Sequence, residues 1–228
     1  MAFHVVDHPL VRHKMTILRD VETSTKKFRE LVSEVTLLLT YEATRAMQTT
    51  PIEVTTPLET CTGETLETAR VVIAPILRAG LGMVEGMLGL FPRASVAHIG
   101  MFRDEKTFQP RVYYQSMPRR MEGSTVFIVD PMLATAGSMA AAVNLIKKAS
   151  PAKINVIALI ASPQGRDRIM REHPDIDVYV AALDRCLNEN AYILPGLGDA
   201  GDRMFDSYKV EFQRDPVTGC SSPGTPIS

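Results

Sequence analysis

The chain has 228 residues, of which 45% are hydrophobic, so it is long enough to bury the core of one ordinary globular domain. Its 25 basic and 26 acidic residues nearly cancel, which argues against a nucleic-acid-binding protein that depends on a basic surface. Cys61, Cys186 and Cys220 lack paired or CxxC spacing and form no zinc pattern with the scattered histidines, and their odd number indicates reduced thiols in a cytoplasm. We expect neither a signal peptide nor a membrane span, because no basic segment precedes an apolar run and no apolar stretch approaches about 18 residues.

The first part of the chain is predicted to be mainly helical. Residues 1–22 indicate a turn and a short helical piece, and residues 23–25 (Thr-Ser-Thr) are suitable N-caps for a long helix. The apolar residues of that helix form one stripe, typical of packing on a core, and comprise Phe28, Leu31, Val32, Val35, Leu38, Leu39, Ala43 and Ala46. Residues 49–69 are rich in Thr, Glu and Pro and predict an exposed connection with one short strand.

A buried strand is predicted over Val71–Leu77, and it runs into Arg78, Gly80 and Gly82 before a helix that ends near Leu90. The glycines are similar to a dinucleotide-binding pattern, but the third spacing is one residue too long. We expect instead that small residues let the backbone approach a phosphate and that Arg78 adds a bidentate charged clamp. The alternative is an ordinary surface arginine, although ligands bind at the ends of parallel strands in open α/β sheets.

A third strand is predicted over Ala94–Gly100, where His98 is expected to be a core histidine and not a catalyst. Residues 101–117 are polar and carry a cluster of charges, and Gly100 and Pro110 delimit what we predict to be a protruding hairpin. A charge run of this kind is by default a solvated face.

The most informative stretch is residues 126–138, in which four apolar residues are followed by Asp130, Pro131 and a run of small residues. The apolar residues predict a strand buried on both faces, and helical spacing begins at Met139. A strand, a small-residue loop and a helix N-terminus bring free backbone N–H groups and the positive end of the helix dipole to one point, where an anion can bind. Since Asp130 adds an acceptor for hydroxyl groups, the stretch predicts a ribose-phosphate site. The alternative is an ordinary capped turn, and it is not a P-loop.

Strands are also predicted over Ile154–Ile160 and Ile176–Leu183, with a charged helix from Ser162 to His173 between them. This alternation predicts an α/β fold with a doubly wound, mainly parallel sheet. We expect one domain over residues 1–207 and a flexible tail over residues 208–228, which is rich in Pro, Gly and Ser.

Residues 187–205 contain a proline and several glycines, which bring backbone groups close to a flat ligand such as a pyrimidine. Backbone N–H and C=O groups alone can read the N3–H and the two carbonyls of such a base. The alternative is a glycine-rich turn in which Asp202 and Arg203 pair on the surface.

Three of these stretches, taken in order, resemble motifs of the uracil phosphoribosyltransferases, which belong to the type I phosphoribosyltransferases: Ile76–Gly82, Asp130–Ser138 and Gly196–Arg203. Proline at position 131, where most of the superfamily has a second acid, is characteristic of this family. The family usually has Thr-Gly-Gly-Ser where this chain has Thr-Ala-Gly-Ser, and Ala136 would be strained by about 1 kcal/mol if the position requires a positive φ. The resemblance covers residues 7–207.

The resemblance implies a sheet of the type I kind, a mobile hairpin arm and a small base-binding hood. It also implies synthesis of UMP and diphosphate from uracil and 5-phospho-α-D-ribose 1-diphosphate (PRPP). The residues that it assigns to PRPP are Arg78, Arg103, Asp130, Pro131, Met132, Leu133, Ala134, Thr135, Ala136, Gly137, Ser138 and Asp199. Uracil would be bound by Ile193, Gly198, Asp199 and Ala200. The catalytic residues would be Asp130, Arg103 and Asp199.

The resemblance further implies Mg²⁺, bound mainly through the diphosphate and water, with no dedicated protein ligand set. It implies a cytoplasmic homo-oligomer, with a subunit contact within Asp20–Arg45, and a GTP effector as in some relatives. Two alternatives stay open, namely a pyrimidine-responsive RNA-binding regulator of the same fold and a phosphoribosyltransferase for another base, such as a purine.

Overall fold

The computed structural model describes residues 2–66, 70–103, 110–207, 212–214 and 221–223. Its main sheet is mixed but mostly parallel, and all its neighbouring strands are parallel except the last pair. The strands follow in the order β1 (Phe3–Val5), β11 (Asp177–Leu183), β10 (Lys153–Ala161), β8 (Thr125–Val129), β4 (Val71–Leu77), β6 (His98–Arg103) and β7 (Pro110–Ser116). Two short strands lie off this path, β5 (Ser95–Val96) beside β4 and β9 (Met132–Leu133) beside β10. The predicted α/β fold with a mainly parallel sheet is confirmed.

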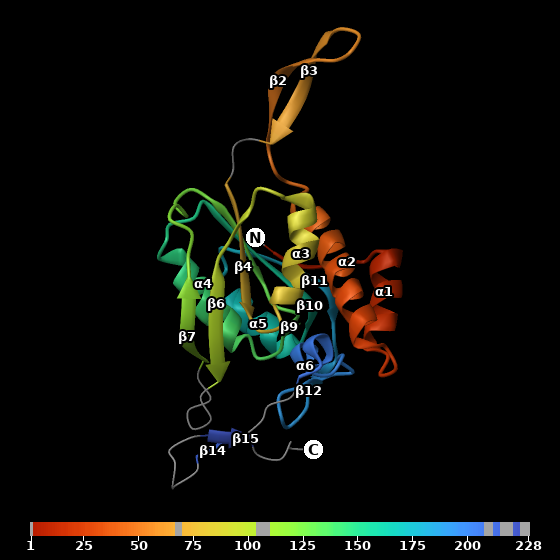
Figure 1. Ribbon diagram of the computed structural model, residues 1–228, viewed down its shortest axis with the longest axis vertical. Coiled ribbons are helices and arrows are strands. Elements are labelled where there is room, and N and C mark those ends of the chain that lie inside the picture. The colour runs from red at the N-terminus through yellow and green to blue at the C-terminus, as the bar shows by residue number, and fades with distance from the viewer. Residues whose placement is uncertain (1, 67–69, 104–109, 208–211, 215–220, 224–228) are drawn as a thin grey trace.

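Helices cover both faces of the sheet, as a doubly wound fold requires. The helices are α1 (Pro9–Arg19), α2 (Thr25–Ala43), α3 (Leu81–Leu90), α4 (Gly137–Lys147), α5 (Pro163–Glu172) and α6 (Ala200–Phe205). In Figure 1, α1, α2 and α3 lie together on one side of the sheet and α4 lies on the other. One apolar core contains buried residues of α1, α2 and α3 with Phe127 and Val129, and a second contains those of α4 with Val126 and Ile128. Alternate residues of β8 therefore face opposite cores, which explains why the strand is apolar throughout.

Capping side chains explain where two of the predicted helices begin. The Ser24 hydroxyl accepts a hydrogen bond from the Lys27 N–H at the start of α2. The Ser162 hydroxyl accepts one from the Gly165 N–H at 2.9 Å at the start of α5, where Pro163 occupies the first helical turn. No helix in the part of the chain that the structure describes is long and apolar enough to cross a membrane.

The structure corrects the prediction for residues 1–69 in two places. The N-terminal segment contributes a strand, β1, which pairs with β11 before α1 begins. Residues 49–69 contain two strands, β2 (Thr49–Thr55) and β3 (Thr60–Leu66), which pair with each other in register from Thr49 and Leu66 to Thr55 and Thr60. Figure 1 shows this hairpin projecting from one end of the molecule. Cross-strand threonines and β-branched residues favour the pairing, although the segment is too polar to show the alternation of a half-buried strand.

The remaining differences concern strand ends and short additional strands. The strand predicted over Ala94–Gly100 is divided into β5 and β6, and β6 continues to Arg103. Strands β6 and β7 form the predicted hairpin, whose residues 104–109 lie outside the described residues. Two two-residue strands, β12 (Cys186–Leu187) and β13 (Ile193–Leu194), pair beside α6. In the region expected to be a tail, β14 (Phe212–Arg214) pairs with β15 (Ser221–Pro223), and the rest of the residues after 207 lie outside the described part.

Candidate active site

The segment Asp130–Ser138, which we call the phosphate loop, begins where β8 ends. It is not one continuous loop. The Pro131 carbonyl accepts hydrogen bonds from the Leu159 and Ile160 N–H groups, both at 3.0 Å, so two residues of β10 oppose one residue here. The chain then re-enters the sheet as β9, in which Met132 pairs with Ile160. This bulge forms because proline has no N–H to donate but still has a carbonyl to accept. Asp130, at the carboxyl end of β8, still donates its N–H to the Ile157 carbonyl of β10 at 3.2 Å, so the bulge begins directly after it.

The backbone of residues 134–138 (Ala-Thr-Ala-Gly-Ser) has its carbonyl groups bound and its amide groups available. The Ser162 hydroxyl donates to the Ala134 carbonyl at 2.6 Å, and Arg168 Nη1 donates to the Thr135 carbonyl at 3.3 Å. In the part of the chain that the structure describes, the amides of residues 135–138 donate to no backbone carbonyl. These amides stand at the N-terminus of α4, so the helix dipole adds positive potential. An anion could accept hydrogen bonds from these amides, and their role in binding one stays a prediction.

Ala136 adopts the left-handed conformation, with φ 57° and ψ 10°, and is only 4% exposed. An alanine in this region is strained by about 1 kcal/mol relative to glycine. The strain foreseen for this position is therefore present, and the surrounding contacts maintain it. The helix begins at the next residue, Gly137.

Asp130 has an unusual carboxyl group for a half-buried residue at a sheet edge. The pKa of Asp130 is raised from its ordinary value of 3.8 to about 7, mainly because the carboxyl group is buried; a hydrogen bond from the Met132 N–H opposes this rise, and the charge of Asp199 adds to it. The influence of Asp199 shows that the phosphate loop and the glycine-rich loop after β13 lie close together. A carboxyl group that is costly to ionise indicates a site built to receive a cation or a hydrogen-bond donor.

Arg78 lies at the carboxyl end of β4, as predicted. Its Nη2 atom forms an ion pair with Asp202 Oδ1 at 2.9 Å, and its Nη1 atom donates to the Ser207 hydroxyl at 2.9 Å. The side chain is 49% exposed and a guanidinium has five N–H donors, so donors remain for an anion. The nearby glycines serve packing, because a Cβ on Gly80 would lie 2.6 Å from the Val129 carbonyl oxygen and one on Gly82 would meet the Met204 side chain.

The candidate base site is formed by β13, the turn that follows it and α6. Ile193 and Ala200 are buried, at 3% and 1% exposed. Gly198 is exposed and has φ 76°, a conformation that suits glycine. Asp199 is also exposed and caps α6, because its Oδ1 atom accepts a hydrogen bond from the Asp202 N–H at 3.0 Å.

Residues 195–199, which join β13 to α6, are called the base loop here. Two arginines to which the sequence assigned no role hold this loop in place. Arg19, from α1, makes a bidentate pair with Asp184 at 2.6 and 2.8 Å and donates to the Gly196 carbonyl at 2.7 Å. Asp184, only 7% exposed, also accepts the Gly196 N–H at 3.0 Å. The other, Arg203, donates to the carbonyls of Leu18 and Leu197 at 2.7 and 2.8 Å. The alternative considered for this loop, a surface pair of Asp202 with Arg203, does not form, because Asp202 pairs with Arg78.

The sequence held a signal for one of the two residues of the Arg19–Asp184 pair. Asp184 directly follows β11, so it belongs to the same carboxyl edge of the sheet as Asp130 and Arg78. Arg19 had no such signal, because 165 residues separate it from its partner.

The three sequence motifs converge on one place. A Cβ on Gly201 would lie 3.3 Å from Asp199 Oδ1 and 3.6 Å from Arg78 Nη2, which places the first motif against the third. The charge of Asp199 helps to raise the pKa of Asp130, which lies in the second motif. Arg103 is the last residue of β6, and its side chain lies outside the described part of the chain, so its expected contact with diphosphate stays a prediction. Among the described residues, no group of three or more His, Cys, Asp or Glu side chains could hold a metal ion by itself.

Comparisons with known proteins agree with this geometry. The model of the family described as uracil phosphoribosyltransferase matches residues 5–207. A uracil phosphoribosyltransferase of Exiguobacterium sibiricum is 52% identical over 202 residues, which is 89% of this chain and 97% of the relative. One of Thermosipho melanesiensis is 51% identical over 205 residues, which is 90% of this chain and 99% of the relative. A solved structure of a protein from Aquifex aeolicus has a TM-score of 0.85 at 37% identity and covers 90% of this chain and 98% of its own. The chain therefore belongs to the uracil phosphoribosyltransferase family.

Proposed function

We propose that this enzyme transfers the phosphoribosyl group of PRPP to uracil, which yields UMP and diphosphate. The observation that carries the proposal is the set of available amides at residues 135–138 beside the Asp130 carboxyl group. A phosphate group and vicinal ribose hydroxyls require those two kinds of partner side by side. The proximity of Arg78 and Asp199 at Gly201, the influence of the Asp199 charge on Asp130 and the names of the relatives that are about half identical support the same conclusion.

The proposed mechanism consists of positioning and electrostatic stabilisation. Amides of residues 134–138 hold the 5-phosphate, and Asp130 accepts hydrogen bonds from the ribose hydroxyls and lies near the ring, where positive charge develops as the C1–O bond breaks. Arg78 and Arg103 stabilise the departing diphosphate. Closure of the β6–β7 arm would exclude water from the reacting centre.

The base is proposed to bind between the buried Ile193 and the backbone of residues 198–200. Asp199 uses one carboxylate oxygen to cap α6, which leaves the other to orient the uracil edge or to accept its N1 proton. Because the cap fixes the side chain, we favour orientation as its main role. Arg19 and Asp184, which bind the backbone of Gly196, would keep the base loop in the conformation that binds the pyrimidine.

The residues present fit Mg²⁺ held mainly by substrate. Asp130 is the one acid of the phosphate loop, and its costly ionisation would be relieved by a nearby cation. Such a donor set suits an ion that keeps water and substrate phosphates as its ligands. When bound, Mg²⁺ supplies charge neutralisation for the diphosphate.

We further propose a cytoplasmic homo-oligomer that responds to GTP. The resemblance to the family supports the effector, and the unpaired cysteines Cys61 and Cys186 support a reducing compartment. A groove of about 800 Å³ between the N-terminal strand and α2 is lined by Leu10 and Tyr41, which are 51% and 65% exposed, and supports a subunit contact there. Sedimentation analysis, and the rate of UMP formation with and without GTP, test these two points.

The test of the function is UMP formation from uracil and PRPP, with Mg²⁺ or with a chelator, and with orotate, hypoxanthine and adenine as competing bases. We expect magnesium-dependent turnover of uracil and no inhibition by the other bases. If another base reacted faster than uracil, that base would be assigned as the substrate in place of uracil. RNA binding at physiological salt without turnover would indicate a regulator instead.

The role of Asp130 is tested by Asp130→Asn, with Asp7→Asn as a matched control at an exposed residue that pairs with Arg12. We expect Asp130→Asn to lower kcat by about 100-fold or more and Asp7→Asn to leave it unchanged. A near-normal kcat for Asp130→Asn would remove the assigned role.

A further inference from the structure

The protein holds Arg78 with only part of the hydrogen-bonding capacity of its guanidinium group. Arg78 donates once to Asp202 Oδ1 and once to the Ser207 hydroxyl, both at 2.9 Å. Among the described residues, these two contacts leave three of the five N–H donors of the guanidinium group available. By contrast, Arg19 makes a bidentate pair with Asp184 and also donates to a backbone carbonyl. Arg19 therefore serves the fold, whereas Arg78 is held in place and can still bind an anion.

The two residues that hold Arg78 belong to the two ends of one short helix. Asp202 is in the first turn of α6, and Ser207 lies just beyond the C-cap residue of this helix. The helix is itself fixed in place, because Arg29 of α2 donates to the Met204 carbonyl at 3.0 Å and Met204 is fully buried. Since two contacts from a fixed element reach two different nitrogen atoms, they set the orientation of the planar guanidinium as well as its position.

The pair of Arg78 with Asp202 is placed where it contributes little to the stability of the fold. The two side chains are 49% and 25% exposed, and ion pairs that solvent reaches add little to the free energy of unfolding. A free arginine side chain samples many rotamers, and an anion that binds it must restrict them. If the guanidinium is held before the anion arrives, this loss of entropy on binding is smaller. The pair is therefore suited to ligand binding more than to folding.

The side chain and the backbone of Asp202 act on different parts of the site. Its carboxylate holds Arg78, whereas its N–H donates to Asp199 Oδ1 at 3.0 Å and so completes the cap of α6 at the end of the base loop. A substitution of the side chain removes the first contact and leaves the second in place. The effect of Asp202 on the diphosphate side can therefore be separated from its effect on the base side.

We propose that Asp202 is a positioning residue for PRPP, which holds the Arg78 guanidinium where its remaining donors bind the diphosphate. This inference rests on the proposed function, which assigns Arg78 to the diphosphate. A carboxylate repels a diphosphate directly, so the benefit of Asp202 acts through Arg78. Ser207 is a second and weaker support, because its hydroxyl carries no charge.

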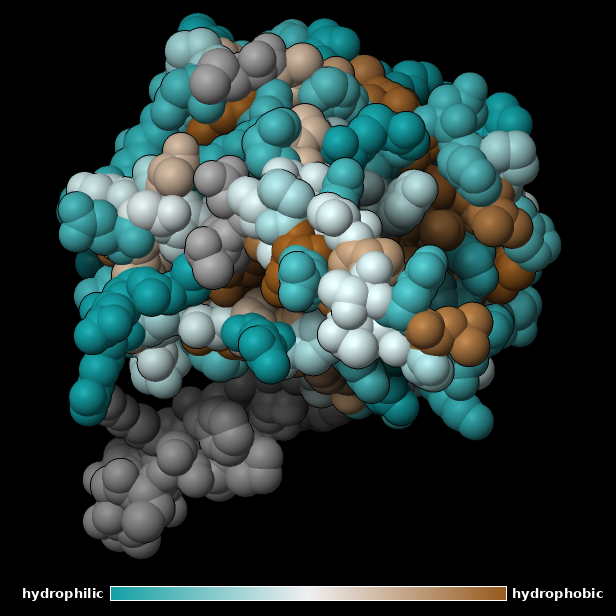
Figure 2. Space-filling view, turned by 90° about the horizontal axis from the view of Figure 1, so that it is seen from above, coloured by the Kyte–Doolittle hydropathy of each residue, from teal (hydrophilic) through white to brown (hydrophobic). Residues whose placement is uncertain are grey.

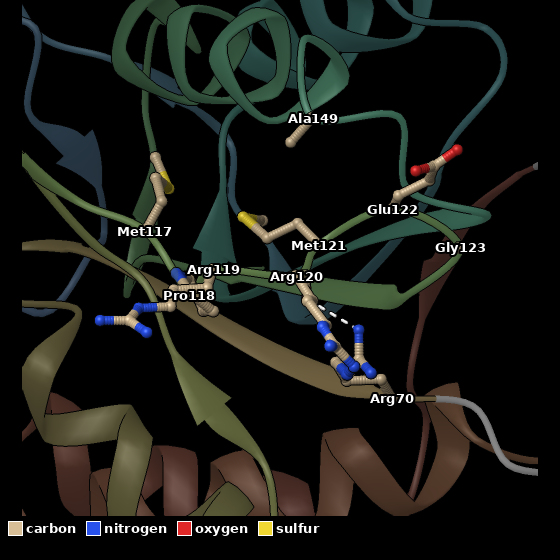
Figure 3. Close-up of a pocket in the computed structure, with 9 residues that line it drawn as sticks. All are labelled: Arg70, Met117, Pro118, Arg119, Arg120, Met121, Glu122, Gly123 and Ala149. Carbon is tan, nitrogen blue, oxygen red and sulfur yellow. Dashed lines mark hydrogen bonds between the residues drawn. The ribbon is translucent and has the colours of Figure 1, made fainter.

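A matched control lies at the other end of the same strand. Arg70 directly precedes β4, as Arg78 directly follows it, and both residues are exposed. In Figure 3, Arg70 Nη1 donates to the Arg120 carbonyl at 3.1 Å, and the Glu122 carboxylate points away from Arg70. Figure 2 looks onto this end of the molecule, from which the β2–β3 hairpin projects, and shows hydrophobic residues as separate patches among hydrophilic ones. Arg70→Met removes an arginine from that surface and leaves the active site as it is.

The test is calorimetric titration of the full chain with PRPP and, separately, with inorganic diphosphate, together with the steady-state kinetics of UMP formation. We expect Asp202→Ala to raise the Kd of both probes and the KM for PRPP by about tenfold, and to leave the KM for uracil unchanged. Asp202→Asn keeps an oxygen that can accept the Arg78 hydrogen bond, so it should raise the same constants by only about threefold. Arg70→Met should bind both probes as the native chain does.

The decisive measurement combines two substitutions. In an Arg78→Met background, Asp202→Ala should have no further effect on the Kd of either probe, because Asp202 acts through Arg78. Independent, additive effects would overturn the proposal. So would an unchanged Kd for Asp202→Ala, or a lower one, which would show that Asp202 masks Arg78. Equal increases in the KM values for PRPP and uracil would also overturn it, because they would assign Asp202 to the structure of α6.

Two further measurements keep the outcomes separate. Equal denaturant midpoints establish that Asp202→Ala folds as the native chain does, and if its midpoint falls, Ser207→Ala repeats the test without removing a charge. We expect Ser207→Ala to raise the Kd of both probes by about threefold, and no rise would contradict the proposal. If the native chain bound PRPP but formed no UMP from uracil, the proposed function would fail, whereas the calorimetric comparison would still decide the role of Asp202.

Discussion

The phosphate loop and the base loop meet in one site but are held by different kinds of interaction. The phosphate loop is shaped by the chain next to it, through the bulge at Pro131, the left-handed Ala136 and the N-terminus of α4. The base loop is held by side chains from far away in the sequence, through Arg19 and Asp184. The first design leaves backbone amides available, and the second fixes the shape of a flexible, glycine-containing turn.

This difference has an energetic consequence. A loop shaped by local backbone geometry depends on steric fit, and substitutions there act through strain or close contacts. A loop held by a buried ion pair depends on that pair being complete, because one partner alone leaves an uncompensated charge. The following predictions use substitutions that separate the two cases.

The largest effect is expected for Arg19→Met, which removes the cation from the Arg19–Asp184 pair. Asp184 has a side chain only 5% exposed, so its carboxylate would remain buried without a partner. We expect a loss of about 3 kcal/mol in the free energy of unfolding, together with a higher KM for uracil. Denaturant unfolding and steady-state kinetics measure the two effects.

The control for this prediction is Arg12→Met, which breaks an ion pair with Asp7 whose side chains are 66% and 74% exposed. That change should cost less than about 1 kcal/mol. The double variant Arg19→Met/Asp184→Asn should recover part of the stability, because it removes the buried charge as well. If Arg19→Met cost no more than Arg12→Met, the pair would be an ordinary surface contact and the base loop would have another support.

The same contrast explains what could be predicted from the sequence. The phosphate loop, Arg78 and the central strands were predicted because each leaves a local pattern, such as four apolar residues followed by Asp130 and small residues. The partners of Arg19 and Arg203 leave none, because they are chosen by packing between segments far apart in the chain. The polar β2–β3 hairpin was missed because its strands pair with each other and bury no face, so no alternation marks them.

The second prediction concerns Gly165, where α5 approaches the phosphate loop. A Cβ at this position would lie 2.3 Å from the Leu133 carbonyl oxygen and 2.4 Å from that of Ala134. Since both neighbours are backbone, Gly165→Ala should displace the loop, cost about 2 kcal/mol of stability and raise the KM for PRPP. Gly89→Ala is the control, because nothing lies within 4 Å of its Cβ, and it should stabilise α3 slightly. Equal kinetics for both variants would show that the loop does not depend on this contact.

The third prediction uses the pH dependence of stability. The pKa of Asp130 is raised mainly by burial to about 7 from an ordinary value of 3.8, so the folded chain binds this proton more tightly than the unfolded chain. Stability is therefore lost as the pH rises from about 4 to about 7. Asp130→Asn removes this loss, and the variant should be more stable than the native chain by about 2 kcal/mol at pH 8 but not at pH 4. A stability difference that stays constant from pH 4 to pH 8 would contradict the burial of this carboxyl group.

The smallest effect is expected at Ala136, where strain and side-chain burial oppose each other. Ala136→Gly relieves the left-handed conformation, but it removes a methyl group that is nearly buried and makes the unfolded chain more flexible. We expect a net gain of about 0.5 kcal/mol, measured as a higher denaturant midpoint. Ala140→Gly, one turn further along α4, is the matched control and should cost about 1 kcal/mol, because that residue is helical. Losses of equal size at both positions would mean that the loop bears no strain at Ala136, and its geometry would then have to be maintained by the contacts of Ser162 and Arg168 alone.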